Sequence, residues 1–209
     1  MSELRAEVLA TALAMNAAGI NRGAAGNVSA KRGEGFLITP TGLDYDQIGP
    51  ADIVAMSMDG SFSGQRKPSS EWRFHRDIYA LRAEAGAVVH AHSPFATALA
   101  CMDIPVPAFH YMIARFGGAD VRCARYATFG SQELSDSALV ALEGRSACLL
   151  AHHGMLVLGR DLTQALSRAV ELETLCEQYW RVLAIGGPRL LPEQEMARVL
   201  EKFAAYGQQ

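Results

Sequence analysis

Apolar positions recur along the first third of the chain with two different periods. Between Leu4 and Leu13 they have the spacing of an amphipathic helix, which the glycine-rich stretch over 19–26 then ends. Short apolar runs over 35–40 and 53–57 predict strands, and Asp59-Gly60 after the second run predicts a hairpin turn. This part of the chain therefore predicts a helix followed by antiparallel strands.

The middle of the chain predicts a helix, a strand and a second helix. Residues 71–81 have helical spacing, with Ser69 or Ser70 as the N-cap. The run over 87–92 predicts a strand, and Ser93-Pro94 supplies an N-cap and a first-turn proline for the helix that follows. Strand and helix are thus expected in direct succession.

The last third predicts two buried strands and two helices. The strands, over 147–153 and 155–158, flank a tight turn, and the helices cover 162–185 and 192–206. No repeat, low-complexity tract or long linker divides the chain. We therefore expect a single domain over residues 1–209.

Composition adds limits on the possible partners and on the location. The 209 residues carry a net charge of −3 with both signs interspersed, so no basic surface for nucleic acid or anionic membrane is expected. Charged residues interrupt every apolar run before it could span a membrane. The four cysteines form no C-x-x-C pair, which favours reduced thiols. We expect a soluble, cytoplasmic protein.

Histidines are the first candidates for chemistry. His90 and His92 lie on one face of a predicted strand, about 7 Å apart along the backbone, where both imidazoles could bind one metal ion or serve as hydrogen-bonded core residues. His152 and His153 end a second strand, and only one of them can face the first pair. Three histidines with an open fourth position are typical of catalytic zinc.

Glu71 is the candidate for a fourth ligand. It begins a helix whose other residues look buried, although a glutamate in a first turn also stabilises the helix dipole without any further role. The hydroxyls of Ser69 and Ser70 stand beside it, and the Gly26-Asn27 and Thr41-Gly42 loops offer further free backbone N–H groups. Together these features predict a phosphate pocket beside a metal ion.

Seven segments, in order and across nearly the whole chain, resemble the class II aldolase/adducin family, and within it the L-fuculose-1-phosphate aldolase group. They are Gly26-Asn-Val-Ser29, Ile38-Thr-Pro-Thr-Gly42, Pro68-Ser-Ser-Glu-Trp-Arg-Phe-His75, Val88-Val-His-Ala-His92, His110-Tyr-Met-Ile113, Tyr126-Ala-Thr-Phe-Gly130 and His152-His-Gly154. The resemblance implies a three-layer α/β/α sandwich with a largely antiparallel central sheet. It also implies a homotetramer with active sites between adjacent subunits.

The resemblance further assigns roles to individual residues. It implies one Zn²⁺ per subunit on His90, His92 and His153, with Glu71 as the fourth ligand and the catalytic acid/base. It places the phosphate of the substrate on six residues in three loops: Gly26, Asn27, Thr41, Gly42, Ser69 and Ser70. It brings Tyr111 of a neighbouring subunit to the site as a proton donor, together with Phe129 and Tyr206.

The function that the resemblance implies is reversible cleavage of a sugar phosphate. The main expectation is a zinc-dependent aldolase that splits a ketose 1-phosphate such as L-fuculose 1-phosphate into dihydroxyacetone phosphate and lactaldehyde. One alternative is an aldolase of methylthioribulose or deoxyribulose 1-phosphate salvage. Another is an L-ribulose-5-phosphate 4-epimerase, which typically has aspartate where this chain has Glu71. The third is a non-catalytic adducin-like binding module, which would lack the histidine set.

Overall fold

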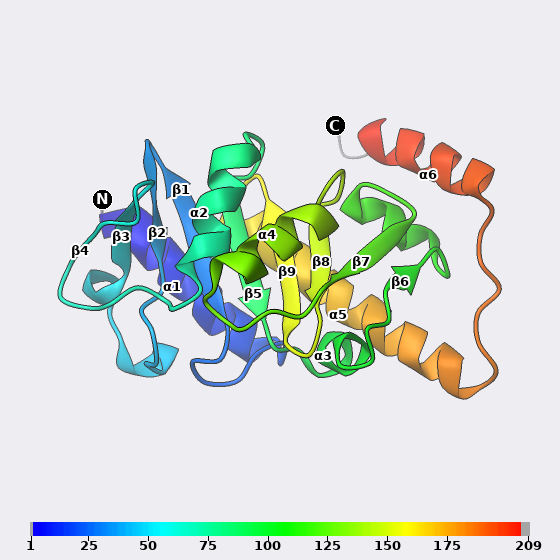
Figure 1. The fold of residues 1–209 in the computed structure, drawn as a ribbon, viewed down its shortest axis with the longest axis horizontal. Coiled ribbons are helices and arrows are strands. Elements are labelled where there is room, and N and C mark those ends of the chain that lie inside the picture. The colour runs from blue at the N-terminus through cyan, green and yellow to red at the C-terminus, as the bar shows by residue number, and fades with distance from the viewer. Residues whose placement is uncertain (1, 206–209) are drawn as a thin grey trace.

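A nine-stranded mixed sheet forms the middle of the computed structural model, which describes residues 2–205 (Figure 1). The strand order is β4-β3-β2-β1-β5-β9-β8-β7-β6, and every neighbouring pair is antiparallel except β7 and β8. The strands are β1 (Asn27–Arg32), β2 (Gly35–Ile38), β3 (Val54–Ser57), β4 (Phe62–Ser63), β5 (Ala87–Ala91), β6 (Val106–Pro107), β7 (Asp120–Ala124), β8 (Ala147–Leu150) and β9 (Gly154–Gly159). The largely antiparallel sheet that the sequence predicts is confirmed.

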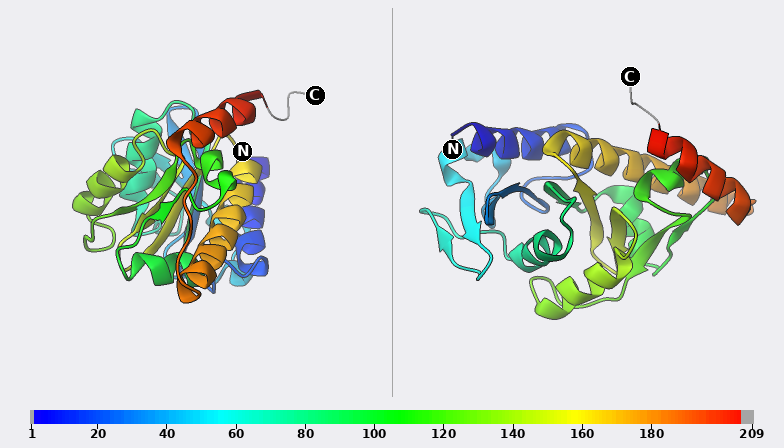
Figure 2. Two further views of the ribbon diagram at one scale, coloured as in Figure 1. Left: turned by 90° about the vertical axis from the view of Figure 1, so that its right-hand side faces the viewer. Right: turned by 90° about the horizontal axis from the view of Figure 1, so that it is seen from above.

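Helices cover both faces of this sheet. They are α1 (Ser2–Ala17), α2 (Trp72–Leu81), α3 (Pro94–Ala100), α4 (Gln132–Ala141), α5 (Leu162–Ala184) and α6 (Glu193–Ala205), with the 3-10 helices η1 (Tyr45–Gln47), η2 (Pro50–Asp52) and η3 (Tyr111–Phe116). Seen from above, α1 and α5 lie on one side of the sheet, and α2 and α4 lie on the other (Figure 2). The three-layer sandwich is therefore confirmed.

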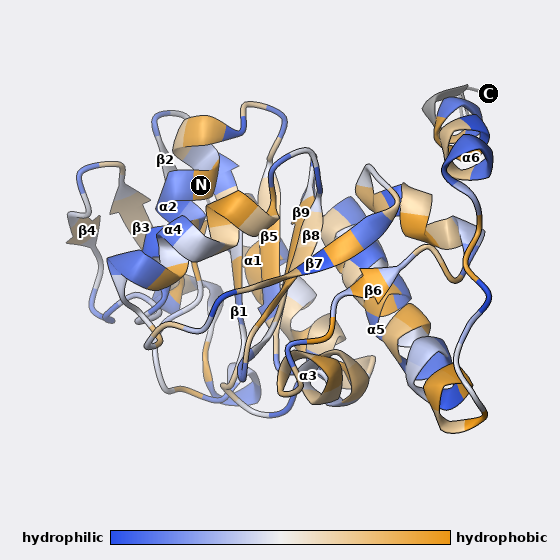
Figure 3. Ribbon diagram, turned by 45° about the vertical axis from the view of Figure 1, so that its right-hand side comes forward, coloured by the Kyte–Doolittle hydropathy of each residue, from blue (hydrophilic) through white to orange (hydrophobic). Residues whose placement is uncertain are grey.

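Strand alternation divides the core into one apolar cluster on each side of the sheet. Val89 of β5 and Val157 of β9 belong to the cluster beneath α1 and α5, whereas Val88 and Leu158 belong to the cluster beneath α2 and α4. Both faces of β8 and β9 are covered, so these strands are apolar throughout, as the hydropathy colours of Figure 3 show. Burial on both faces fixes the central strands that carry the site.

Local signals in the sequence placed most of these elements correctly. The β3–β4 hairpin is confirmed, and α3 begins at Pro94 with Ser93 as its N-cap residue. The predicted cap of α2 is wrong, because Glu71 occupies the N-cap position and Ser69 accepts the backbone N–H of Glu71 at 3.3 Å. The Ser69 hydroxyl thus binds the backbone of the N-cap residue and not an N–H group within the helix.

The C-terminal helix α6 lies apart from the central layers. An extended connection joins it to α5, and it packs on η3 at the edge of the molecule (Figure 1). Tyr206, which the resemblance brings to the site, lies outside the described residues. No helix within residues 2–205 is both long and apolar enough to cross a membrane.

Candidate metal centre

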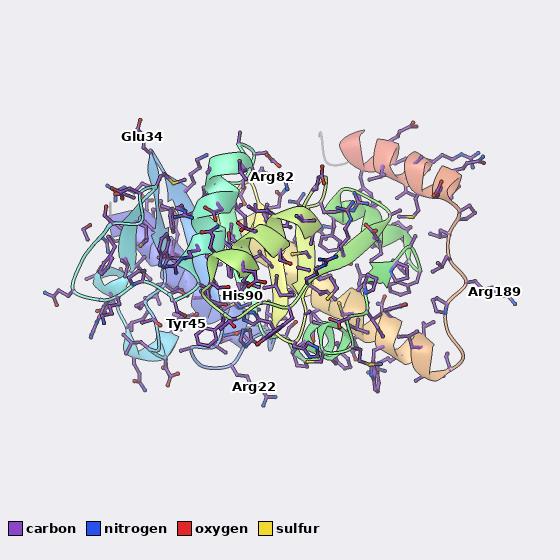
Figure 4. The ribbon with its side chains drawn as sticks, viewed as in Figure 1. Arg22, Glu34, Tyr45, Arg82, His90 and Arg189 are labelled. Atoms are coloured by element: carbon purple, nitrogen blue, oxygen red, sulfur yellow. The ribbon has the colours of Figure 1, made fainter. Side chains whose placement is uncertain are left out.

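Four side chains from three parts of the chain converge at one end of the central strands. His90 is the penultimate residue of β5, and His92 follows the end of that strand. His153 lies in the turn between β8 and β9, and Glu71 is the N-cap residue of α2. One nitrogen or oxygen atom from each of the four lies within 4.8 Å of the others. Figure 4 labels His90 near the middle of the ribbon.

The distances between these atoms match the size of a metal site. His90 Nε2 is 3.0 Å from His92 Nε2 and 3.1 Å from Glu71 Oε2, and His153 Nε2 is 3.2 Å from Glu71 Oε1. The three imidazole rings lie 4.8–4.9 Å apart and are steeply inclined to one another. Tetrahedral zinc with bonds of about 2.0–2.1 Å would separate its ligand atoms by about 3.3 Å. The four atoms therefore surround a space of the right dimensions.

The hydrogen-bond partners leave lone pairs facing this space. His90 Nδ1 lies 2.9 Å from the carbonyl oxygen of Met155 and donates its hydrogen there, so Nε2 of a neutral ring is left unprotonated. Oε1 of Glu71 is buried and makes no hydrogen bond, although His153 lies close to it. A buried acceptor without a donor is costly, and a bound cation would satisfy Glu71 Oε1 and the lone pair of His90 Nε2 together.

Burial and charge keep these groups in the states that a cation requires. Burial, followed by the charge of His90, lowers the pKa of His92 and of His153 to about 4 each, so both rings are neutral near pH 7. Burial alone would raise the pKa of Glu71, but His90 first and His153 next, which stabilise the carboxylate anion when they are protonated at low pH, together with the Asn27 amide, outweigh it and lower that pKa to about 2. Near pH 7 the site thus holds the carboxylate anion of Glu71 and the neutral imidazoles of His92 and His153.

His152 lies outside this cluster, for a reason that differs from the one predicted. The two neighbouring histidines do not end an extended strand, because β8 stops at Leu150 and both occupy the tight turn before β9. His152 has a left-handed backbone with φ of 54°, and its half-exposed ring lies 5.9 Å from that of Tyr126. Turn geometry, rather than strand alternation, sends the two imidazoles in different directions.

Two of the three predicted phosphate loops lie side by side. Segments 39–41 and 67–69 pair as antiparallel extended chain, so the 41–42 and 69–70 loops are neighbours. Three of these four residues are exposed, and Ser69 is buried. Exposed N–H and hydroxyl groups of two adjacent loops suit an anion.

Gly26 and Asn27, from the third loop, are built into the sheet. A Cβ atom on Gly26 would lie 2.3 Å from the carbonyl oxygen of His90, so only glycine fits where β1 begins beside β5. The amide of Asn27 is buried, with Nδ2 3.0 Å from Glu71 Oε2 and Oδ1 2.5 Å from His75 Nε2. The side chain of Asn27 therefore contacts the metal cluster from behind, and its oxygen is already occupied.

Phe129 and Tyr111 occupy different places in the chain. Phe129 is exposed. The next residue, Gly130, lies against the serine loop, since a Cβ atom there would lie 2.7 Å from the carbonyl oxygen of Ser70. Tyr111 is half exposed and lines a cleft of about 1430 Å³ between η3 and α6, to which none of the four cluster residues contributes. A single chain does not bring Tyr111 to the cluster.

Comparison with known proteins agrees with this fold. The family model described as "Class II Aldolase and Adducin N-terminal domain" matches residues 6–180. A 5-methylthioribulose-1-phosphate/5-deoxyribulose-1-phosphate aldolase of Rhodospirillum rubrum is 56% identical over 204 residues, which cover 98% of this chain and 92% of that protein. The L-fuculose phosphate aldolase of Escherichia coli is 44% identical over 207 residues, 99% of this chain and 96% of the enzyme.

A solved structure gives the same result at the level of the fold. An L-fuculose 1-phosphate aldolase superimposes with a TM-score of 0.95 at 39% identity, and the match covers 98% of this chain and 97% of that one. The similarity therefore extends over the sheet, both helical layers and the loops of the cluster.

Proposed function

The chain belongs to the class II aldolase and adducin family, and from this premise we propose that it is an aldolase of 5-methylthioribulose 1-phosphate and 5-deoxyribulose 1-phosphate. Cleavage would yield dihydroxyacetone phosphate and methylthioacetaldehyde or acetaldehyde. Identity of 56% to an aldolase of these two substrates, against 44% to a fuculose phosphate aldolase, supports this substrate class. The comparison thus favours the salvage alternative over the L-fuculose 1-phosphate expected from the sequence motifs.

The observation that supports catalysis is the intact cluster of Glu71, His90, His92 and His153. A binding module without chemistry has no need of a buried carboxylate facing three imidazole nitrogens. Glutamate, rather than aspartate, supports cleavage over epimerisation, because the longer side chain can leave the metal position and still reach a substrate carbon.

We propose Zn²⁺ as the metal, one ion per subunit, on the four cluster residues. Neutral imidazoles and a carboxylate at tetrahedral spacing are a donor set that zinc prefers. When bound, such a cation withdraws electron density from the substrate carbonyl and so stabilises the negative charge that builds up as the carbon–carbon bond breaks.

Glu71 is the proposed base. In the condensation direction its carboxylate would remove a proton from the hydroxymethyl carbon of dihydroxyacetone phosphate. A lowered pKa keeps Glu71 ionised, and Asn27 Nδ2 holds one of its oxygens at 3.0 Å. The carboxylate therefore stays deprotonated and held at one oxygen while the other is available for the proton.

The phosphate of the substrate would bind in the loops that precede Glu71 and lie beside it. The adjacent 41–42 and 69–70 loops are the proposed phosphate site, with Gly26 and Asn27 shaping its inner wall. Phosphate held far from the reacting bond converts binding energy into orientation. Phe129 is exposed and precedes Gly130, whose backbone lies against Ser70, and its ring would supply apolar surface toward the substrate.

Tyr111 would act from a neighbouring subunit. Its place in a cleft that none of the cluster residues line supports this arrangement. We propose a homotetramer in which Tyr111 gives its proton to the aldehyde oxygen, with Tyr206 also contributing to the site. The subunit would be one domain over residues 1–209, working in the cytoplasm where charged sugar phosphates are retained.

A cleavage assay over three ketose 1-phosphates tests this proposal. Release of dihydroxyacetone phosphate is followed with a coupled dehydrogenase for 5-methylthioribulose, 5-deoxyribulose and L-fuculose 1-phosphate. We expect kcat/KM to be about 10-fold or more higher for the first two, because one pocket contact changes specificity by about 1–3 kcal/mol.

Two outcomes would contradict the proposal in different ways. A preference for L-fuculose 1-phosphate would support the aldolase reaction but contradict the proposed substrates. An epimerised pentulose phosphate without dihydroxyacetone phosphate would replace the aldolase with an epimerase.

A further inference from the structure

Five buried polar side chains form a continuous ladder behind Glu71. They alternate between α2 and β1 in the order Glu71, Asn27, His75, Ser29 and Tyr79. Asn27 contacts Glu71 Oε2 at 3.0 Å and His75 Nε2 at 2.5 Å, and Ser29 Oγ contacts His75 Nδ1 at 2.6 Å and the Tyr79 hydroxyl at 2.7 Å. All five side chains are buried, and His75 and Ser29 are fully so. Ser29, His75 and Tyr79 take no part in the predicted metal and phosphate sites.

The ladder forms because the repeats of a helix and a strand nearly coincide. Glu71, His75 and Tyr79 are four residues apart, which is about 6 Å along an α-helix. Asn27 and Ser29 are two residues apart on one face of β1, which is about 6.7 Å along a strand. Each strand residue therefore fits between two helix residues, and the ladder continues for two complete steps.

The acceptor-only chemistry of a carboxylate determines the direction of every hydrogen in this ladder. Glu71 can only accept, so Asn27 must present its NH₂ group to Glu71 and its oxygen to His75. His75 must then carry its hydrogen on Nε2 and accept from the Ser29 hydroxyl at Nδ1. Ser29 in turn accepts from Tyr79. One arrangement of hydrogens satisfies all five groups.

His75 is the member that decides this arrangement. If its hydrogen were on Nδ1, the lone pair of Nε2 would face Asn27, the amide would rotate, and the Asn27 oxygen would confront the carboxylate of Glu71. Burial lowers the pKa of His75 to about 3, so the ring is neutral and carries a single hydrogen.

We propose that His75 is a positioning residue, which holds the Asn27 amide with its NH₂ group toward Glu71 and so directs the second carboxylate oxygen, Oε1, into the metal cluster. This inference rests on the metal site proposed above and on no particular substrate. Ser29 fixes the tautomer of His75, and Tyr79 anchors Ser29 at the far end.

The tautomer of His75 provides the first test, on the unaltered and metal-free protein. Two-bond ¹H–¹⁵N correlation spectra of ¹⁵N-histidine protein distinguish the two neutral tautomers, and the His75 signals are those missing from His75→Gln. We expect the Nε2–H form. A neutral ring with its hydrogen on Nδ1 would overturn the proposal whether or not any variant folds.

A matched pair of substitutions provides the second test. His75→Gln keeps a donor at the position of Nε2, whereas His75→Asn keeps a polar group only at the position of Nδ1, toward Ser29. With Co²⁺ as the probe, we expect the dissociation constant to rise about 10- to 100-fold in His75→Asn, with changed visible absorption, and to stay within about 3-fold of the parent in His75→Gln.

The outcomes separate a positioning role from a packing role and from failure of the proposed function. Equal loss of Co²⁺ affinity in both variants, or parental affinity and absorption in His75→Asn, would contradict positioning. Neither the spectra nor the metal titration requires a substrate. They remain decisive even if the cleavage assay finds another reaction.

Discussion

The hydroxyl of Ser93 donates a hydrogen bond of 2.6 Å to Oε2 of Glu173, eighty residues further along the chain. Glu173 also accepts the backbone N–H groups of Phe95 and Ala96, at 2.8 and 2.9 Å, and so caps α3 from the middle of α5. Since Ser93 follows His92 directly, this buried carboxylate fixes the backbone at the point where β5 ends and the metal cluster begins.

Replacing Glu173 by glutamine should lower stability substantially. The amide keeps the shape but brings an NH₂ group against N–H and O–H donors, and hydrogen bonds to a charged acceptor contribute about 1.5–3 kcal/mol. We expect the free energy of unfolding, measured with urea, to fall by about 2 kcal/mol. Glu171→Gln is the control, because Glu171 is partly exposed and meets Arg115 at 3.3 Å, which predicts a loss below about 1 kcal/mol.

Removal of one cluster histidine should release the metal. We expect the purified protein to contain about one zinc per subunit by elemental analysis, and His92→Ala to contain far less, because three ligands bind zinc more weakly than four. His152→Asn is the matched control, since asparagine tolerates the left-handed backbone at that position. Undiminished zinc in His92→Ala, or loss in His152→Asn, would place the ion elsewhere.

Glu71→Gln should separate proton transfer from metal binding. The three histidines would still hold zinc, more weakly than the four ligands do, and the amide cannot accept the proton, so with Zn²⁺ in excess deuterium exchange at the hydroxymethyl carbon of dihydroxyacetone phosphate should fall about 100-fold or more. Metal content measured on the same samples is the control. Exchange at the parental rate would mean that another residue, and not Glu71, is the base.

Tyr111→Phe should show the opposite pattern. Proton removal from dihydroxyacetone phosphate precedes protonation of the aldehyde oxygen, so exchange should persist while aldol turnover falls by about 10²-fold or more. Mixing Tyr111→Phe subunits with Glu71→Gln subunits offers a further check. If Tyr111 acts across an interface, hybrid tetramers should regain activity, and an absence of any regain would contradict the shared site.

The metal-free protein should lose stability as the pH falls through the range of its buried histidines. Burial lowers the pKa of His75 to about 3, and burial with the charge of His90 lowers that of His92 and His153 to about 4, all from 6.5. Below pH 6.5 these histidines become protonated in the unfolded chain but stay neutral in the folded chain. The free energy of unfolding is therefore highest above pH 6.5 and falls progressively toward pH 4.

Urea unfolding between pH 7.5 and 4.5 measures this loss, and His75→Gln isolates one contribution. A single fully shifted histidine adds a slope of up to about 1.4 kcal/mol per pH unit, which the variant should lack. Glu71 contributes to the pH dependence of stability only at lower pH, because its pKa is lowered from 4.5 to about 2 in the folded chain. A slope in His75→Gln equal to that of the parent would contradict burial of a neutral ring.

The parts of the fold that the sequence predicted are those governed by neighbouring residues. Alternation within one strand placed His90 and His92 together, and Ser93-Pro94 marked the start of α3. Strand β1 was missed, because Ser29 and Lys31 interrupt its apolar positions and the glycine loop before it looked like irregular chain. Ser29 is polar because it contacts His75, which no local pattern reveals.

Local patterns also do not predict which distant segments of the chain pair with one another. The parallel contact of β7 and β8 and the turn that separates His152 from His153 depend on how the sheet closes around them. One signal for the buried ladder was present, since Glu71, His75 and Tyr79 form a polar stripe of spacing four on an otherwise apolar helix face. Such a stripe indicates polar partners on a neighbouring strand.

The strand order described above also determines when during folding the cluster can form. β5 lies between β1 and β9, each about sixty residues away in sequence, so the centre of the sheet requires two long loops to close before its contacts are made. On a ribosome, the histidines of β5 would emerge long before His153 and β9. The nascent chain therefore acquires the geometry of the cluster only after β9 has emerged, as a late product of long-range pairing.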